Sequence, residues 1–297
     1  AKASKCARGS DSPAAMALHQ LTDCSGILEN ATGHLLSIRC NYGTSILPSL
    51  FGVKPFLMDE KLDTLPTSHP LDGGRDAMRR IVDNGVPPLT DGDWPRVIET
   101  AKFYRDLLAP FPKTSRAVHI YHPDLQGPLD CTELLWGSDL FLAFMDQPDL
   151  VKAVLQLIVD TYTALMKEWF DLFPPENGHA VHWHEFHRGH IMLRNDSAMN
   201  ISPDMFDEFV VPFDSQLLAT FGGGAEHFCG RGDHYIASLS DLPGVNAVNL
   251  TQPEYNDMET IFRFTVDRGI QLIGLDRAAA EEALAAGRDL HGNVHVK

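Results

Sequence analysis

The second half of the sequence alternates short apolar segments with capped helical segments, and this order constrains the fold more than any other feature. Runs typical of buried strands lie at residues 180–184, 225–229, 245–250, 270–275 and 294–296. Helical spacing marks the segments at residues 202–211, 233–241, 257–268 and 278–286. Ser202 is typical of a helix N-cap, Pro203 of a first helical position and Gly269 of a helix end. The pattern predicts βαβ units around a parallel sheet.

The first half is less regular but adds elements of the same kind. Strands are predicted at residues 35–40 and 116–121, with helices at 96–108, 134–146 and 148–171. The total approaches the eight strands of a TIM-like (β/α)8 barrel. The sequence contains neither a G-x-G-x-x-G motif nor a phosphate loop, and this favours the barrel over an open nucleotide-binding sheet. We therefore expect an α/β protein with one barrel domain over residues 35–297, after a helical N-terminal lead-in over residues 1–34.

The charge balance and the cysteines limit the partners and the compartment. There are 24 Lys and Arg residues against 40 Asp and Glu, a net charge of −16 that repels nucleic acids. No apolar run is long enough for a membrane span, and no secretory signal segment opens the sequence. Five cysteines, far apart and without a C-x-x-C pair, argue against a disulfide framework. We expect a cytoplasmic protein without nucleic-acid or membrane partners.

The pair His227 and Cys229 is the sharpest chemical signal in the sequence. Residues two apart on a strand point to the same face, so both side chains can approach one metal ion. Imidazole and thiolate are ligands that Zn²⁺ prefers. The alternative is a buried cysteine beside a hydrogen-bonded histidine, and the spacing alone leaves both open.

Polar residues at other predicted strand ends are further candidates, because barrel active sites lie at the carboxyl ends of the strands. Glu185 and Asp276 follow two strands, as paired carboxylates of a glycosidase would. His179 to His190 contains five of the 14 histidines, and His182 and His184 share a strand face. Arg39 and Arg188 could bind a substrate carboxylate. For each group the alternative is packing or ordinary surface charge.

Four short motifs together resemble the uroporphyrinogen decarboxylase superfamily, which also contains zinc-dependent methyltransferases that act with corrinoid proteins. The resemblance covers roughly residues 35–296, and its motifs are Gly43 to Gly52, Asp124 to Pro128, Asn195 to Ser197 with the helix start Ile201 to Phe206, and His227 to Gly230. It implies a TIM-like barrel, in agreement with the strand–helix alternation.

The resemblance to the methyltransferase branch implies a zinc ion held by His227 and Cys229. Zinc there lowers the pKa of an acceptor thiol, which then attacks a methyl group on cobalt. The later cysteine of that branch has no counterpart after Cys229, and we take Asp276 as a further ligand, with His291 and the histidines of residues 179–190 as alternatives. We assign catalytic roles to Asp196, His184 and Glu185, and substrate binding to Arg39, Asp124 and Asn249.

The leading hypothesis is thus a methyltransferase that moves a methyl group between a corrinoid (cobalamin) and a thiol or other small-molecule acceptor. The corrinoid would be a substrate or the cargo of a partner protein, and a homodimer is left open. One alternative is a decarboxylase of a porphyrinogen or a smaller acid, although Arg39 is all that remains of an arginine-rich first loop. Another is a barrel that binds a ligand without catalysis.

Overall fold

The structure is a computed structural model that describes residues 12–56, 67–175 and 177–297. The chain forms two compact units, the first within residues 1–126 and 131–174 and the second within residues 127–130 and 175–297. Each unit is described by itself. The described part of the expected N-terminal lead-in contains helix α1 (Pro13–Asn30). One domain over residues 35–297 stays a prediction.

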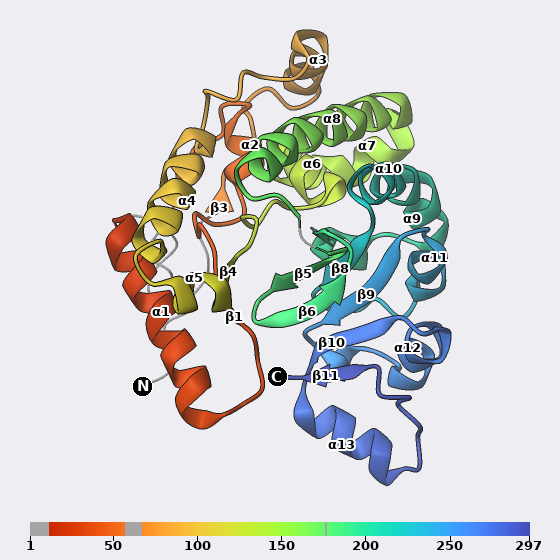
Figure 1. Cartoon of the computed structure of the whole chain (residues 1–297). Coiled ribbons are helices and arrows are strands. Elements are labelled where there is room, and N and C mark those ends of the chain that lie inside the picture. The colour runs from red at the N-terminus through yellow and green to blue at the C-terminus, as the bar shows by residue number, and fades with distance from the viewer. Residues whose placement is uncertain (1–11, 57–66, 176) are drawn as a thin grey trace. The chain divides into compact units, whose positions relative to one another are not determined.

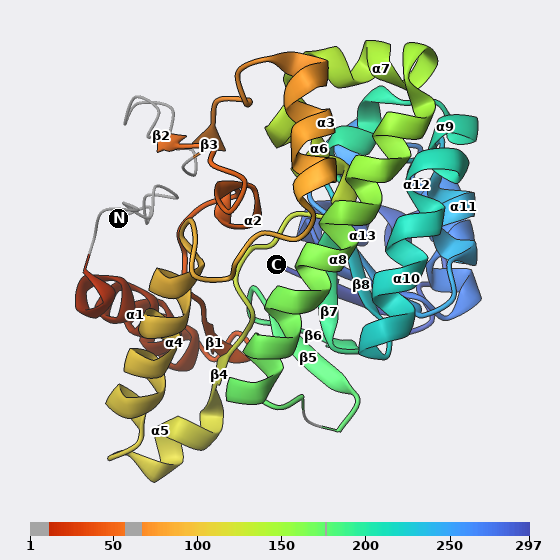
Figure 2. The same cartoon turned by 90° about the horizontal axis from the view of Figure 1, so that it is seen from above.

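The first unit is mainly helical. Its helices after α1 are α2 (Ile46–Ser49), α3 (Gly74–Asn84), α4 (Trp94–Leu108), α5 (Pro112–Ala117), the greater part of α6 (Pro128–Trp136), α7 (Leu140–Asp146) and α8 (Pro148–Leu172). Its strands are β1 (Leu36–Ile38), β2 (Pro55–Phe56), β3 (Thr67–Ser68) and β4 (Val118–Ile120). Strands β1 and β4 pair in parallel, and α3 and α7 pack beside α8 (Figure 2).

Helix α8 illustrates how the sequence builds this unit. Pro148 is accepted in the first turn, where a missing N–H leaves no bond unmade. Fully buried side chains then recur every three or four residues along the helix, at Val151, Val154, Leu155, Ile158, Tyr162, Leu165, Met166 and Trp169. The helix therefore buries one continuous apolar stripe.

The second unit contains a five-stranded parallel sheet in the order β11-β10-β9-β8-β7. The strands are β7 (Ile191–Arg194), β8 (Gly224–Phe228), β9 (Val245–Leu250), β10 (Gln271–Leu275) and β11 (Val294–Val296). The helices are α9 (Pro203–Phe209), α10 (Val211–Phe221), α11 (Ile236–Asp241), α12 (Met258–Phe264) and α13 (Arg277–Ala285). Helices α9 to α12 lie on one side of the sheet, and a two-stranded hairpin lies on the other (Figure 1).

The strands predicted from residue 225 onward are confirmed, and they are parallel neighbours in chain order. The strand predicted at residues 180–184 is wrong. There, β5 (His179–His182) and β6 (Glu185–Arg188) form an antiparallel hairpin, and the sheet strand is β7. The chain reverses at Trp183 (φ 48°) and His184 (φ 69°), a two-residue turn with two left-handed residues. Neither residue is Gly or Asn, so the turn left no signal in the sequence.

The turn of the hairpin packs against one face of the parallel sheet, where two of the side chains are small. Met192, Ala225, Ala247 and Ile273, one from each of four neighbouring strands, form a fully buried cluster. Trp183 packs against this cluster, while strand β6 contacts β8, β9 and β10. The two alanines therefore leave the space that the indole ring enters.

A mixed α/β fold with a parallel sheet is confirmed. Among the residues that the structure describes, the strand pairings give an open five-stranded order and no closed eight-stranded barrel. Within the same described ranges, every helix is too short or too polar to cross a membrane.

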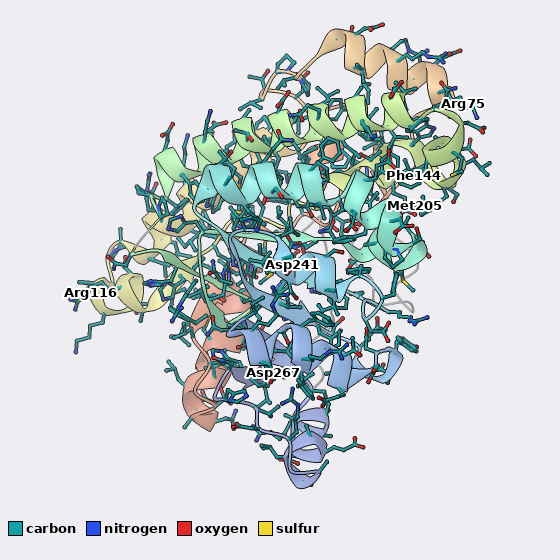
Figure 3. The ribbon with its side chains drawn as sticks, turned by 90° about the vertical axis from the view of Figure 1, so that its right-hand side faces the viewer. Arg75, Arg116, Phe144, Met205, Asp241 and Asp267 are labelled. Atoms are coloured by element: carbon teal, nitrogen blue, oxygen red, sulfur yellow. The ribbon has the colours of Figure 1, made fainter. Side chains whose placement is uncertain are left out.

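Exposed ion pairs connect the outer segments of the second unit. Figure 3 labels two of their acids, Asp241, which pairs with Arg268, and Asp267, which accepts a hydrogen bond from Arg288 at 2.7 Å. Surface pairs of this kind contribute about 0–1 kcal/mol each. The buried faces of the sheet and helices therefore provide most of the stability.

Candidate metal centre

Three potential metal ligands meet at the carboxyl end of the sheet in the second unit. His227 is in β8, Cys229 follows this strand, and Asp196 follows β7. His227 Nε2 lies 3.4 Å from Cys229 Sγ and 3.4 Å from Asp196 Oδ1. One donor atom from each residue lies within 4.8 Å of the others. We call these three residues the Asp196 cluster.

Backbone hydrogen bonds hold the two loops of the cluster together. Asp196 Oδ1 accepts a hydrogen bond from the backbone N–H of Cys229 at 2.8 Å. The buried carboxylate of Asp130 accepts from the backbone N–H groups of Asp196 (2.9 Å) and Ser197 (2.8 Å). The loop after β7 is thus fixed from both sides, which aims the Asp196 carboxylate at β8.

Two neighbours position the ring of His227. Asn249 is the register partner of His227 on β9, and its Oδ1 lies 2.6 Å from Nδ1 of the ring. The indole of Trp183 meets the imidazole edge-on, with ring centroids 4.9 Å apart. The imidazole is consequently fixed with Nε2 toward Cys229 and Asp196.

The surroundings of Cys229 favour its protonated form. Burial, followed by the charge of Asp196, raises the pKa of the thiol to about 11, although Thr251 donates a hydrogen bond to Sγ at 3.3 Å. A free nucleophilic cysteine needs a lowered pKa instead. The chain's own charges therefore do not activate Cys229 as a nucleophile.

A buried carboxyl pair lies behind the loop of Asp196. Asn195 Nδ2 donates to Asp214 at 2.7 Å and to Glu226 at 2.9 Å, and both acids are fully buried. Burial raises the pKa of Asp214 to about 7, and burial together with Asp214 raises that of Glu226 well above its usual range. Both side chains thus hold their protons up to higher pH values than exposed carboxyl groups do.

The structure brings together His227, Cys229, Asp196 and Asn249 of the residues chosen from the sequence. Asp276 is not among them, because its exposed carboxylate caps α13 by accepting from the N–H groups of Ala278 and Ala279. Asp276 thus serves as a helix cap, whereas Asp196 supplies the carboxylate that lies beside His227 and Cys229.

The remaining candidates lie elsewhere. His184 is in the turn of the hairpin, and Glu185, in β6, lies 3.6 Å from His295. In the first unit, Arg39 Nη1 donates to Asp124 Oδ2 at 2.6 Å, so these two form a largely buried ion pair with each other. Catalysis or substrate binding by these four residues stays a prediction.

Sequence reasoning assigned no individual role to three residues that support the cluster, Asp130, Asn195 and Thr251. Thr251 directly follows β9, so its place at a strand end was a usable signal. Asn195 directly follows β7, and before that strand was known it appeared only as the first residue of the Asn195 to Ser197 motif. Asp130 lies in the first turn of α6, where an acidic residue is common without any functional role.

No family model matches this sequence, and no curated protein matches it. Among solved structures, the chain is similar to a methyltransferase from Methanosarcina mazei, with 17% sequence identity and a TM-score of 0.69. The match covers 98% of this chain and 80% of the other. At this identity, the likeness shows that the two chains share a fold.

Proposed function

We propose that this chain is a zinc-dependent methyltransferase in which Asp196, His227 and Cys229 hold the metal. The convergence of these three donor atoms, within 4.8 Å of one another, carries the proposal. The fold shared with a methyltransferase and the His227 to Gly230 motif support the reaction class. A TIM-like barrel over residues 35–297 is part of this proposal, supported by the parallel chain-order sheet.

The donor set fits zinc. One imidazole nitrogen, one thiolate sulfur and one carboxylate oxygen are typical zinc ligands, and three protein ligands are typical of catalytic sites, which keep a further position for substrate. When bound, zinc would lower the pKa of an acceptor thiol, so that the reactive thiolate is present at neutral pH.

The chain's own residues prepare this site in distinct ways. Asp130 holds the Asp196 loop, Asn249 holds the ring of His227, and Thr251 donates to the sulfur of Cys229. The indole of Trp183 packs edge-on against the imidazole, with ring centroids 4.9 Å apart. Proposed substrates are a small thiol as acceptor and a methylated corrinoid, free or carried by a partner protein, as donor.

A decarboxylase is less well supported by the same residues. Arg39 is the arginine that would bind a substrate carboxylate, and its guanidinium already forms an ion pair with Asp124. Ligand binding without catalysis is an outcome of the test below. Cytoplasmic location and a homodimer stay predictions.

Elemental analysis of the purified full chain tests the metal site. We expect about one zinc per chain, and we expect Cys229→Ser to lose zinc while its thermal unfolding changes little. Cys24→Ser is the matched control, because buried Cys24 lies in α1 of the first unit and should leave the zinc content unchanged.

Transfer of the methyl group from methylcobalamin to 2-mercaptoethanol tests the reaction. The wild type should catalyse the transfer and Cys229→Ser should not. Wild-type protein that holds no zinc, even after incubation with the metal, would contradict the metal site. Zinc without methyl transfer would leave the site but overturn the reaction class in favour of ligand binding.

A further inference from the structure

The side-chain amide of Asn249 has one orientation that its neighbours accept. Its Nδ2 donates a hydrogen bond to the backbone carbonyl oxygen of Ile273 at 2.8 Å. A carbonyl oxygen only accepts hydrogen bonds, so the reversed amide would place two oxygens against each other. The amide oxygen of Asn249 is thereby directed at Nδ1 of His227.

Strand β10 also fixes the position of this amide. Gly274 has a φ of +67°, which other residues rarely adopt, and a Cβ atom there would lie 2.4 Å from Asn249 Nδ2. Glycine thus satisfies both the local backbone and the close approach of the amide. Since Asn249 is only 4% exposed, water cannot readily replace these contacts.

We propose that Asn249 is a positioning residue that fixes the neutral ring of His227 as the tautomer protonated at Nδ1. An amide oxygen can only accept, so the proton of the bond between Asn249 and His227 belongs to Nδ1. The lone pair of the ring is then on Nε2. Nε2 is the nitrogen that faces Cys229 and Asp196, each at 3.4 Å.

The consequence for the metal rests on the proposed function. A histidine ligand binds through the nitrogen that its other hydrogen bond leaves unprotonated, and its outer partner maintains ring orientation and basicity. Without Asn249, the ring is free to carry its proton on Nε2, which blocks the nitrogen that faces the cluster. Asn249 would thus prepare the site before the metal arrives.

Nitrogen NMR of the full chain tests the tautomer directly. The protein is labelled with ¹⁵N-histidine, and long-range ¹H–¹⁵N correlations are recorded before and after zinc is removed. His227→Gln identifies the signals of His227 by their loss. We expect the metal-free wild type to show a ring protonated at Nδ1, and Asn249→Ala to shift the ring toward the Nε2-protonated form.

Competition with a chromophoric chelator measures the effect on zinc. Loss of an outer-shell partner commonly lowers metal affinity about 10–100-fold, and we expect a loss of this size in Asn249→Ala. Asn249→Asp keeps an acceptor for Nδ1 and should retain the tautomer, although it loses the donor that bonds the carbonyl oxygen of Ile273. Asn246→Ala is the matched control on the same strand, since Asn246 donates to the backbone carbonyl of Gly244 at 2.9 Å.

The outcomes separate this inference from the proposed function. A wild-type ring protonated at Nε2 overturns the inference, and if zinc still binds, the proposed metal site stands. An Nδ1-protonated ring in protein that binds no zinc supports the tautomer but overturns the metal site. Unchanged tautomer and affinity in Asn249→Ala would show that Asn249 does not position the ring, whether or not that variant loses stability.

Discussion

The buried carboxylate of Asp130 accepts a hydrogen bond at 2.9 Å from the backbone N–H of Asp196, the residue whose side chain completes the candidate metal centre. Its other oxygen accepts from Ser197 at 2.8 Å. In Asp130→Asn, one oxygen is replaced by an NH₂ group, which faces an N–H donor. We expect a loss of about 1–3 kcal/mol in the free energy of unfolding, because one buried N–H loses its acceptor.

Zinc affinity should fall in the same variant, since the released loop no longer aims Asp196 at β8. Urea unfolding and chelator competition measure the two effects. Asp207→Asn, an exposed position on α9, is the control and should change neither. A variant with full stability and full zinc affinity would remove Asp130 from the support of the site.

A comparison of two aspartates identifies the carboxylate ligand. Asp196→Asn should weaken zinc binding at least about tenfold, because the neutral amide is a poor zinc ligand. Asp276→Asn should leave zinc affinity unchanged and cost at most about 1 kcal/mol of stability, because Asn is also a good helix N-cap. Zinc titrations of both variants decide between them, and the reverse result would restore Asp276 as the ligand.

The buried acid Asp214 should make stability depend on pH. Its pKa is raised from 3.8 to about 7 by burial, so the folded chain binds this proton more tightly than the unfolded chain. The stabilisation is complete below pH about 4 and is lost as pH rises toward about 7. Asp214→Asn replaces this ionisable group with an amide that does not titrate. The stability of the variant relative to wild type should therefore increase with pH across that window.

Urea unfolding of wild type and Asp214→Asn between pH 4 and pH 8 measures this difference. The relative gain of the variant should reach the order of a few kcal/mol at the upper end. Parallel curves for the two proteins would mean that Asp214 titrates as an ordinary carboxyl group. Asp207→Asn again provides an exposed control that should follow the wild type.

Gly274→Ala should destabilise the fold and disturb the site together. The left-handed backbone and the contact at 2.4 Å with Asn249 both oppose a Cβ atom, and we expect a cost of about 1–3 kcal/mol. Gly26→Ala is the contrast, since nothing lies within 4 Å of the added Cβ in helix α1. It should raise stability by about 0.5–1 kcal/mol. Equal effects in urea unfolding would contradict this interpretation of Gly274.

The start of α9 at Ser202 and the elements from residue 225 onward were predictable because each one has its own local signal. Apolar strand segments, the cap at Ser202 and the glycine helix end at Gly269 are encoded within a few residues. The pairing of His227 with Cys229 follows from strand parity, which also needs no tertiary information. Local spacing therefore determined four of the five strands of the parallel sheet, β8 to β11, and two of the three members of the Asp196 cluster.

The hairpin, the third member of the Asp196 cluster and the support of the site depended on tertiary structure. The sequence predicted one strand at residues 180–184, whereas a turn at Trp183 and His184 divides this region into the two strands of a hairpin. Both Asp196 and Asp276 follow a strand, and the sequence cannot distinguish a carboxylate that caps its own helix from one that reaches the next strand. Local patterns determine which residues occupy the strand ends, whereas contacts between distant segments decide which of those residues meet.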